Sequence, residues 1–231
     1  MTKGFIFDYG GTLDTRGNHW GKVLWHAYER NSVPVGEDDF RKAYVHAERT
    51  LAKNRIIMPT STFHDTLSKK IRLQMDYLEE NCGMENSGRF HALVLDDVYT
   101  IARETTAESV GVLKVLHRDF PLVLVSNFYG NINTVLSEFG FDGLFSHVVE
   151  SAVVGIRKPD PRIFLLGTEK LGTKPQETMV VGDSYGKDIL PAEKAGCQTT
   201  WIKGEGWTDD DVEAPVAGRI IHDLSELYKI L

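Results

Sequence analysis

The chain has 231 residues, of which 42% are hydrophobic and 26% are charged. This length can hold a large domain or a core with a smaller inserted domain, and the composition is typical of an ordered globular protein. The net charge of -7 disfavours nucleic acid or an anionic membrane surface as the main partner, because both select for basic patches. We therefore expect a small-molecule ligand, with no nucleic-acid and no membrane partner.

The first residues, MTKGFIFDYG, run directly into an apolar segment without the h-region of a secretory signal. No apolar stretch approaches the roughly 18 residues of a membrane span. Cys82 and Cys197 lack any C-x-x-C spacing, which predicts free thiols and no disulfide or zinc site. These features together predict a cytoplasmic protein.

Residues 4–7 (GFIF) predict a buried strand that ends at Asp8 and turns at the two glycines of DYGG. After this strand the apolar residues recur with helical spacing, in blocks separated by Pro34 and Gly36 and by a glycine-rich segment at 83–88. The helical blocks cover about residues 20–28, 40–51, 63–78 and 90–101. This pattern predicts an all-helical insert.

From about residue 107 onward, helices alternate with short apolar strands. This alternation predicts an α/β core, a three-layer Rossmann-like parallel sheet with helices on both faces. We place the core at residues 1–16 and 95–231 and the helical cap at 17–94, and we expect the acidic run 209–211 to be a solvated loop. The expected strands are 122–125, 147–150, 178–181 and 199–202, and the expected helices are 107–117, 132–139, 161–171, 187–195 and one from 224.

Polar side chains follow the predicted strands at the edge where such sheets bind ligands, beyond the carboxyl ends of the strands. Together they supply carboxylates, a hydroxyl, an amide and a cation. That set suits a phosphoryl group held with a divalent metal, because several phosphate oxygens must be neutralised. The residues are Asp8 after GFIF, Ser126 and Asn127 after LVLV, Lys158 in GIRKPDP, and Asp183 after MVVG.

With these motifs the chain resembles the haloacid dehalogenase superfamily of hydrolases, of the type with a helical cap inserted after the first motif. Residues 8–12 (DYGGT) are similar to motif I of that family, and Ser126-Asn127 to motif II. Lys158 is similar to the motif III lysine, and Asp183 followed by Asp188 to motif IV. The order of the motifs and their strand-end placement agree over nearly the whole chain.

The resemblance implies a phosphohydrolase of small phosphorylated metabolites in which Asp8 attacks phosphorus and forms an aspartyl-phosphate. It also implies Mg²⁺ held by Asp8, the backbone carbonyl of Gly10 and Asp183, since Mg²⁺ prefers oxygen ligands. Asp188 would either bind the metal, directly or through water, or orient Lys158. Cap hinges are implied near residues 16–18 and before residue 107. The phosphate-binding residues implied are Gly11, Thr12, Ser126, Asn127 and Lys158, of which Lys158 also offsets repulsion between nucleophile and substrate.

Gly10 departs from the family pattern, which places there a second Asp that protonates the leaving oxygen and then activates water. General acid–base help of this kind is worth roughly 10²–10⁴ in rate. Its absence predicts a substrate with a good leaving group, such as an acyl phosphate or an anhydride, or else a substitute proton carrier. The nearest candidates for such a carrier are His19, Asp14 and Tyr9.

Different chemistry is the other way to accommodate Gly10. The 2-haloacid dehalogenases that the chain resembles use no metal and replace the motif IV acid, so the retained Asp183 favours phosphoryl transfer. A phosphonatase-like reaction needs a cap lysine with a lowered pKa as a Schiff base. A catalytically impaired phosphate-binding or regulatory protein is the remaining alternative. The cap lysines, which we expect to be solvated, are Lys22, Lys42, Lys53, Lys69 and Lys70.

Overall fold

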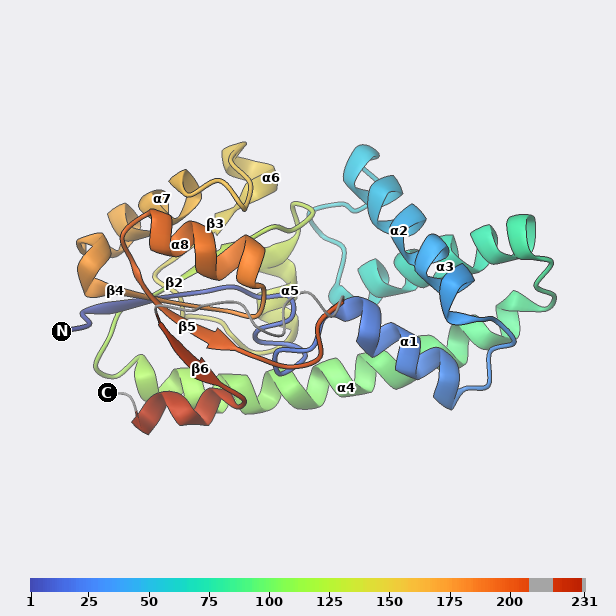
Figure 1. Ribbon diagram of the computed structural model, residues 1–231, viewed down its shortest axis with the longest axis horizontal. Helices are drawn as coiled ribbons and strands as arrows, with labels where there is room; N and C mark the ends of the chain where they lie inside the picture. The colour runs from blue at the N-terminus through green and yellow to red at the C-terminus, as the bar shows by residue number, and fades with distance from the viewer. Residues whose placement is uncertain (208–217, 230–231) are drawn as a thin grey trace.

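The computed structural model describes residues 1–207 and 218–229, so the acidic run 209–211 lies outside the described residues. Its described strands form a parallel sheet of six in the order β3-β2-β1-β4-β5-β6 (Figure 1). The first five confirm the predicted strands, whereas β6, of only three residues, was not predicted. The strands are β1 (Gly4–Phe7), β2 (Leu122–Ser126), β3 (His147–Glu150), β4 (Thr178–Gly182), β5 (Gln198–Ile202) and β6 (Arg219–Ile221).

Helices cover both faces of this sheet, which confirms the three-layer α/β core. Because side chains alternate along a strand, Phe5 and Phe7 of β1 point to one face and Ile6 to the other. Ile6 packs in the same cluster as Phe164 of α7 (Arg162–Leu171), while Phe5 belongs with Leu113 of α4 (Ser87–Leu116). The remaining core helices are α5 (Ile132–Glu138), α6 (Ser151–Val154) and α8 (Leu190–Lys194).

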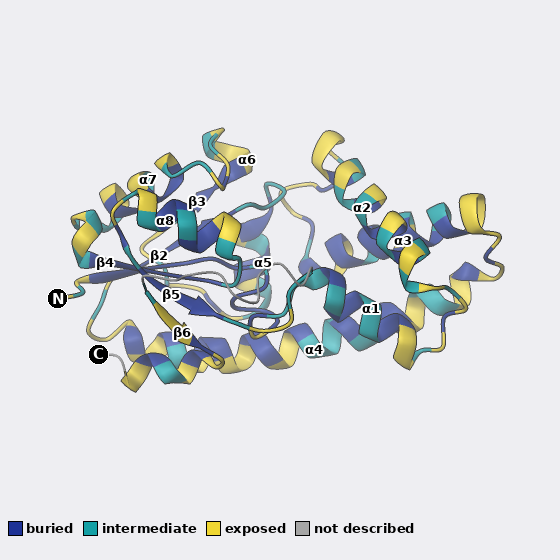
Figure 2. Cartoon of the chain, viewed as in Figure 1, coloured by how far each residue is buried: buried dark blue, intermediate teal, exposed yellow. Residues whose placement is uncertain are grey.

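Three helices and the first half of a fourth lie beyond the end of the sheet (Figures 1 and 2). Their apolar faces meet around Leu24, Phe40 and Ile71, which are fully buried, as the helical spacing predicts. These helices are α1 (Trp20–Arg30), α2 (Glu37–Lys53), α3 (Phe63–Cys82) and α4 (Ser87–Leu116).

The helix α4 differs from the prediction, because it is continuous over 30 residues where two separate helices were expected. The intervening sequence IARETTA contains neither Gly nor Pro, so nothing in it interrupts the helix. The expected boundary at 94/95 and the expected hinge before residue 107 therefore both fall inside one helix.

Two other expected helices take different forms. The segment expected as a helix over 187–195 begins with a π-helical turn at Tyr185–Ile189 and continues as α8, where Pro191 stands near the start. A π-helical turn is often found at functional sites, and this one carries Asp188. The expected closing helix is a 3₁₀ helix at Leu224–Lys229.

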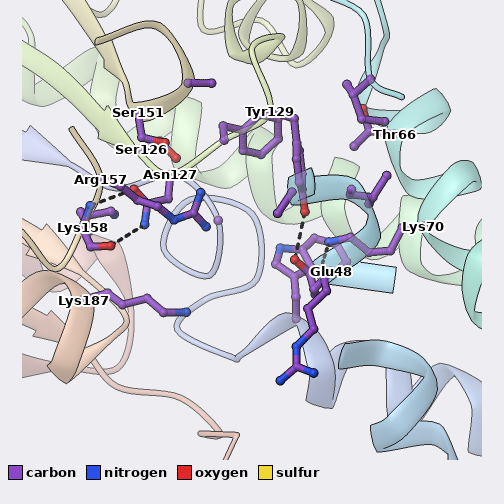
Figure 3. A pocket seen from close by; sticks show the side chains of 18 of the residues that line it. Glu48, Thr66, Lys70, Ser126, Asn127, Tyr129, Ser151, Arg157, Lys158 and Lys187 are labelled. Atoms are coloured by element: carbon purple, nitrogen blue, oxygen red, sulfur yellow. Dashed lines mark hydrogen bonds and ion pairs between the residues drawn. The ribbon is translucent and has the colours of Figure 1, made fainter. Parts of the chain in front are cut away.

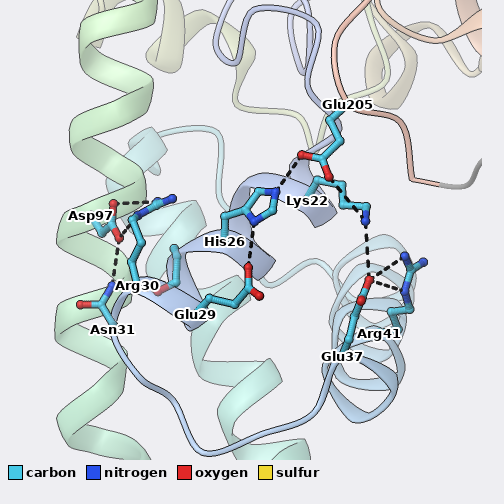
Figure 4. A network of polar contacts seen from close by, with 10 residues as sticks. Lys22, His26, Glu29, Arg30, Asn31, Glu37, Arg41, Asp97 and Glu205 are labelled. Atoms are coloured by element: carbon cyan, nitrogen blue, oxygen red, sulfur yellow. Dashed lines mark hydrogen bonds and ion pairs between the residues drawn. The ribbon is translucent and has the colours of Figure 1, made fainter.

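Polar contacts join the helix α1 to the segment that follows β5 (Figure 4). Nε2 of His26 lies 2.7 Å from Oε2 of Glu205, and Nζ of Lys22 lies 3.5 Å from Oε1 of Glu205. Arg41 of α2 donates to the carbonyl oxygen of Trp207. Exposed pairs of this kind contribute little each, so the segment is held against the helices α1 and α2 by several weak contacts.

Cys82 and Cys197 are free thiols, as predicted. Among the described residues, none of the helices combines the length and the apolar character that a membrane-spanning segment needs.

The continuity of α4 predicts unequal effects of one substitution at two places on it. Leu113 is fully buried beneath the sheet, whereas Leu93 is 45% exposed. Leu113→Ala should lower the free energy of unfolding by about 2–5 kcal/mol, because it leaves a cavity. Leu93→Ala should change it by less than about 0.5 kcal/mol. Urea denaturation of both variants measures the difference, and equal losses would contradict this placement of α4.

Candidate active site

A buried lysine lies between two carboxylates at the carboxyl ends of the central strands. Nζ of Lys158 is 2.7 Å from Oδ1 of Asp8 and 2.6 Å from Oδ1 of Asp188. All three side chains are buried. Burial alone would lower the pKa of Lys158, but the charges of Asp188 and Asp8 outweigh it and raise that pKa, so the ammonium stays protonated.

Asp183 adds a third carboxylate to this site. Ligand atoms of Asp8, Asp183 and Asp188 all lie within 4.8 Å of one another. Burial, together with the charges of Asp188 and Asp8, raises the pKa of Asp183 well above its usual value. Burial also raises the pKa of Asp188 to about 6, although Lys158 opposes that rise. One ammonium does not neutralise this cluster, and oxygen ligands with excess negative charge fit a divalent cation such as Mg²⁺.

Gly11 and Thr12 lie directly against the side chain of Asp183. Gly11 has φ +97°, and a Cβ there would lie 2.2 Å from Oδ2 of Asp183, so only glycine fits. Oγ1 of Thr12 donates to Oδ1 of Asp183 at 3.1 Å. Neither residue is among those that line the cavity at the strand ends, and the phosphate contact expected of them stays a prediction.

Ser126 and Asn127 lie at the end of β2, but they serve the site differently. Ser126 borders the cavity beside Asp8. The Asn127 side chain instead holds the backbone of Lys158: its Nδ2 donates to the Lys158 carbonyl and its Oδ1 accepts from the Lys158 amide, both at 3.0 Å (Figure 3). Asn127 therefore positions Lys158, and the phosphate contact expected of its side chain stays a prediction.

Open space adjoins Gly10, which borders the cavity. A Cβ built on Gly10 would meet, within 4 Å among the described residues, only Cδ1 of Trp20 at 4.0 Å. The residue also has no positive φ, so its backbone accepts other side chains. The position where the family pattern has an acid is therefore vacant but sterically available.

Of the three substitutes for that acid, only His19 borders the cavity. Its Nδ1 accepts a hydrogen bond from the amide of Gly21 at 3.0 Å, which places the ring proton on Nε2. Burial lowers the pKa of His19 to about 4, so the ring is uncharged at neutral pH and is a weak acid. Tyr9 is buried among Phe63, Phe128 and Phe141.

Asp14, the third substitute, is fully buried and organises the loop that follows β1. Its Oδ1 accepts from the amide of Gly11 at 2.7 Å, and its Oδ2 from Nε1 of Trp20 at 2.9 Å. Burial raises the pKa of Asp14 to about 7 despite these hydrogen bonds. Asp14 therefore holds the loop that follows β1 in shape and does not itself border the cavity.

A cavity of about 820 Å³ lies between the strand ends and the helices α1–α3, in the size range of small-molecule sites. Its helical side contains an ion pair that the sequence did not indicate: Nζ of Lys70 is 2.6 Å from Oε1 of Glu48 (Figure 3). The hydroxyl of Tyr129, just after β2, donates to Oε2 of Glu48 at 3.1 Å. A polar contact across the cavity thus joins the segment after β2 to the helices α2 and α3.

The expectation that Lys70 is solvated is therefore wrong, since only 8% of the residue is exposed. Burial would lower the pKa of Lys70, but Glu48 outweighs it and raises that pKa well above its ordinary value. A Schiff base requires a free amine, so this pairing argues against phosphonatase-like chemistry at Lys70. A sequence signal was present, because Lys70 falls on the same helical face as Leu67 and Ile71.

A family model described as haloacid dehalogenase-like hydrolase matches residues 2–196. The chain belongs to this family of hydrolases. It is 34% identical to a glyceraldehyde 3-phosphate phosphatase of Pyrococcus furiosus over 91 residues, which are 39% of this chain and 38% of the relative. The matches to curated relatives cover between 33% and 54% of the relatives' own length.

Solved structures show the same fold at low sequence identity. A dehalogenase aligns with a TM-score of 0.64 and 17% identity, over 100% of this chain and 97% of that one. The HAD-hydrolase YfnB from Bacillus subtilis, bound to magnesium, aligns with a TM-score of 0.58 and 20% identity, over 100% of this chain and 98% of that one. A dehalogenase and a magnesium-bound hydrolase thus share the fold of this haloacid dehalogenase-like hydrolase.

The buried Asp14 predicts a pH dependence of stability in this hydrolase. Because the folded state raises the pKa of Asp14, folding favours its protonated form. The free energy of unfolding should fall as the pH rises from about 4 towards 7, at most by about 1.4 kcal/mol per unit of pKa difference. Asp14→Asn should make this fall smaller, by the share that Asp14 contributes beside Asp183 and Asp188.

Urea denaturation at pH 5 and pH 8, with a chelator present, measures the effect. Asp119→Asn, at an exposed position, is the matched control and should keep the pH dependence of the wild type. An Asp14→Asn variant with an unaltered pH dependence would show that this carboxyl does not titrate with a raised pKa.

Proposed function

We propose that this hydrolase is a Mg²⁺-dependent phosphohydrolase of small phosphorylated metabolites that acts through an aspartyl-phosphate on Asp8. We further propose that it prefers substrates with good leaving groups. The observation that carries the proposal is the paired ammonium of Lys158 beside Asp8, next to the open space at Gly10.

The buried charges support distinct roles for the site residues. Asp8 would attack phosphorus, and the protonated Lys158 would offset the repulsion between its carboxylate and the anionic substrate. Ser126, at the cavity wall, would donate to a phosphate oxygen. Asp188 would orient Lys158, because its Oδ1 binds Nζ of Lys158 and its Oδ2 accepts from the amide of Ser184 at 3.1 Å.

Asp8, Asp183 and the carbonyl of Gly10 would hold Mg²⁺. The ion would supply positive charge against the transferred phosphoryl oxygens. The raised pKa of Asp183 supports this assignment, since a buried carboxylate cluster gains from a divalent cation. The same acid disfavours a dehalogenase, which by family resemblance needs no metal.

Leaving-group selectivity follows from the surroundings of Gly10. His19, the only one of the three substitutes that borders the cavity, is uncharged at neutral pH and is a weak proton donor. A leaving oxygen would then depart largely unprotonated, which acyl phosphates and anhydrides tolerate and alkyl esters do not. The relative named as a glyceraldehyde 3-phosphate phosphatase supports a phosphorylated metabolite as substrate.

We retain residues 17–94 as a cap and 1–16 with 95–231 as the core, with α4 shared between them. In this division the cap supplies α1, α2 and α3 to the cavity wall. The cytoplasmic location expected from the sequence stays a prediction.

Substitution of the nucleophile tests the proposed chemistry. Asp8→Asn should lower phosphate release from acetyl phosphate by several orders of magnitude, because an amide does not form the phospho-enzyme. Chelation of Mg²⁺ should lower it comparably, and added Mg²⁺ should restore it. Asp119→Asn is the control and should retain full activity. Metal-independent release that survives Asp8→Asn would refute the proposal, and Mg²⁺-dependent phosphate binding without turnover would indicate a binding protein.

Restoring the acid at position 10 tests the leaving-group argument. The open space beside Gly10 accepts a side chain, so Gly10→Asp should raise kcat/KM for an alkyl phosphate by about 10²-fold or more. The gain with acetyl phosphate should be much smaller, since its leaving group needs little protonation. Gly10→Asn has the same shape without the acid and should give no gain. Equal gains for the two substrates would contradict the argument.

A further inference from the structure

Outside the acidic cluster and Lys158, the described wall of the cavity is strongly cationic. Glu48 is the one acidic side chain there, and Lys70 neutralises it at 2.6 Å. Five further cations have no acidic counterpart in the described wall. They are Arg49, Lys53, Arg55, Arg157 and Lys187.

None of these five cations takes part in an ion pair within residues 1–207 and 218–229. Other cations of the chain, such as Arg16, Arg30 and Arg162, pair with a carboxylate at 2.5–2.9 Å. The whole chain has 33 acidic and 26 basic residues, so an excess of acids was available to neutralise cations. Five cations without an acidic partner among the described residues therefore border the same cavity.

Two of these cations are chain neighbours of residues in the buried charged cluster. Arg157 directly precedes Lys158, and Lys187 directly precedes Asp188. Lys158 and Asp188 pair with each other and are buried. Arg157 and Lys187 are exposed and border the cavity, as Figure 3 shows.

The charge of Lys187 also acts on His19, which lies at the start of α1. Burial lowers the pKa of His19 most, and the positive charge of Lys187 is the next largest cause. Arg49 borders the cavity from the opposite side, on the cap helix α2. The positive charge therefore lies on both sides of the space that the leaving part of a substrate would occupy.

We infer that the substrate carries a second anionic group, a carboxylate or a further phosphate, on its leaving part, and that Arg157 and Lys187 bind this group while Arg49 approaches it from the cap. The inference rests on the proposed function for the position of the transferred phosphoryl group beside Asp8. Arg157 suits such a group because a guanidinium binds a carboxylate or phosphate through two parallel hydrogen bonds. A substrate with only the transferred phosphoryl group would leave these cations without a counter-charge in the described wall of the cavity.

Binding of phosphonates, which are not hydrolysed at the P–C bond by this chemistry, tests the inference apart from turnover. Isothermal titration calorimetry of the full chain with Mg²⁺ would compare ethylphosphonate, phosphonoacetate and methylenediphosphonate. The two ligands with a second anionic group should bind about tenfold more tightly than ethylphosphonate, as expected for charge-assisted hydrogen bonds. Tighter binding of phosphonoacetate would identify the second anionic group as a carboxylate, and tighter binding of methylenediphosphonate would identify it as a phosphate. The preference should shrink as salt is raised, because the cations are exposed.

The double variant Arg157→Gln/Lys187→Gln should reduce the tenfold preference to less than about threefold, since it removes the charge-assisted contacts. Lys114→Gln/Arg118→Gln removes the same charge at exposed positions away from the cavity and should leave the preference unchanged. Equal affinity for the three phosphonates, or a preference that survives the double variant, would overturn the second anionic group while leaving the phosphohydrolase intact. Failure of all three to bind would overturn both proposals.

Discussion

The buried ammonium of Lys158 is the interaction on which the arrangement of the site depends. A buried cation is costly unless it is paired, and this one is shared between Asp8, at the end of β1, and Asp188, in the turn after β4. Asn127, at the end of β2, fixes the backbone of the same lysine through two hydrogen bonds. A single residue thus brings the ends of three strands to one point, and the parallel sheet supplies the edge at which they meet.

The charges on the two sides of the cavity are complementary. The core side has three carboxylates for one ammonium, which suits a divalent cation, while the remaining wall has an excess of positive charge. The ion pair of Lys70 and Glu48 is neutral as a unit and is tied to the core through Tyr129. Metal, transferred phosphate and a second anionic group would therefore alternate in charge with the protein groups around them.

Much of this arrangement was predictable from the sequence for a simple physical reason. Short apolar runs that end in a polar residue define parallel strands, and the residues after them must share one edge of the sheet. That reasoning placed Asp8, Lys158 and Asp183 together, and the structure brings them together.

Contacts between distant segments were not predictable. The partner of Lys70 is Glu48 in another helix, and the orientation of the Thr12 hydroxyl depends on Asp183, which is 171 residues away in the chain. The continuity of α4 does not follow from the apolar pattern, which is interrupted over residues 101–107 although IARETTA is free of helix breakers. The strand β6 is too short for its alternation to be recognised.

In the proposed mechanism Asp8 works beside a vacant acid position, so that the leaving group departs without a proton. This is tested by measuring kcat/KM for a series of aryl phosphates of increasing leaving-group pKa, in saturating Mg²⁺. The logarithm of kcat/KM should fall steeply along the series, because negative charge builds up on an unprotonated oxygen. A value nearly independent of leaving-group pKa, with chemistry shown to limit the rate, would mean that another side chain supplies the proton and would contradict this mechanism.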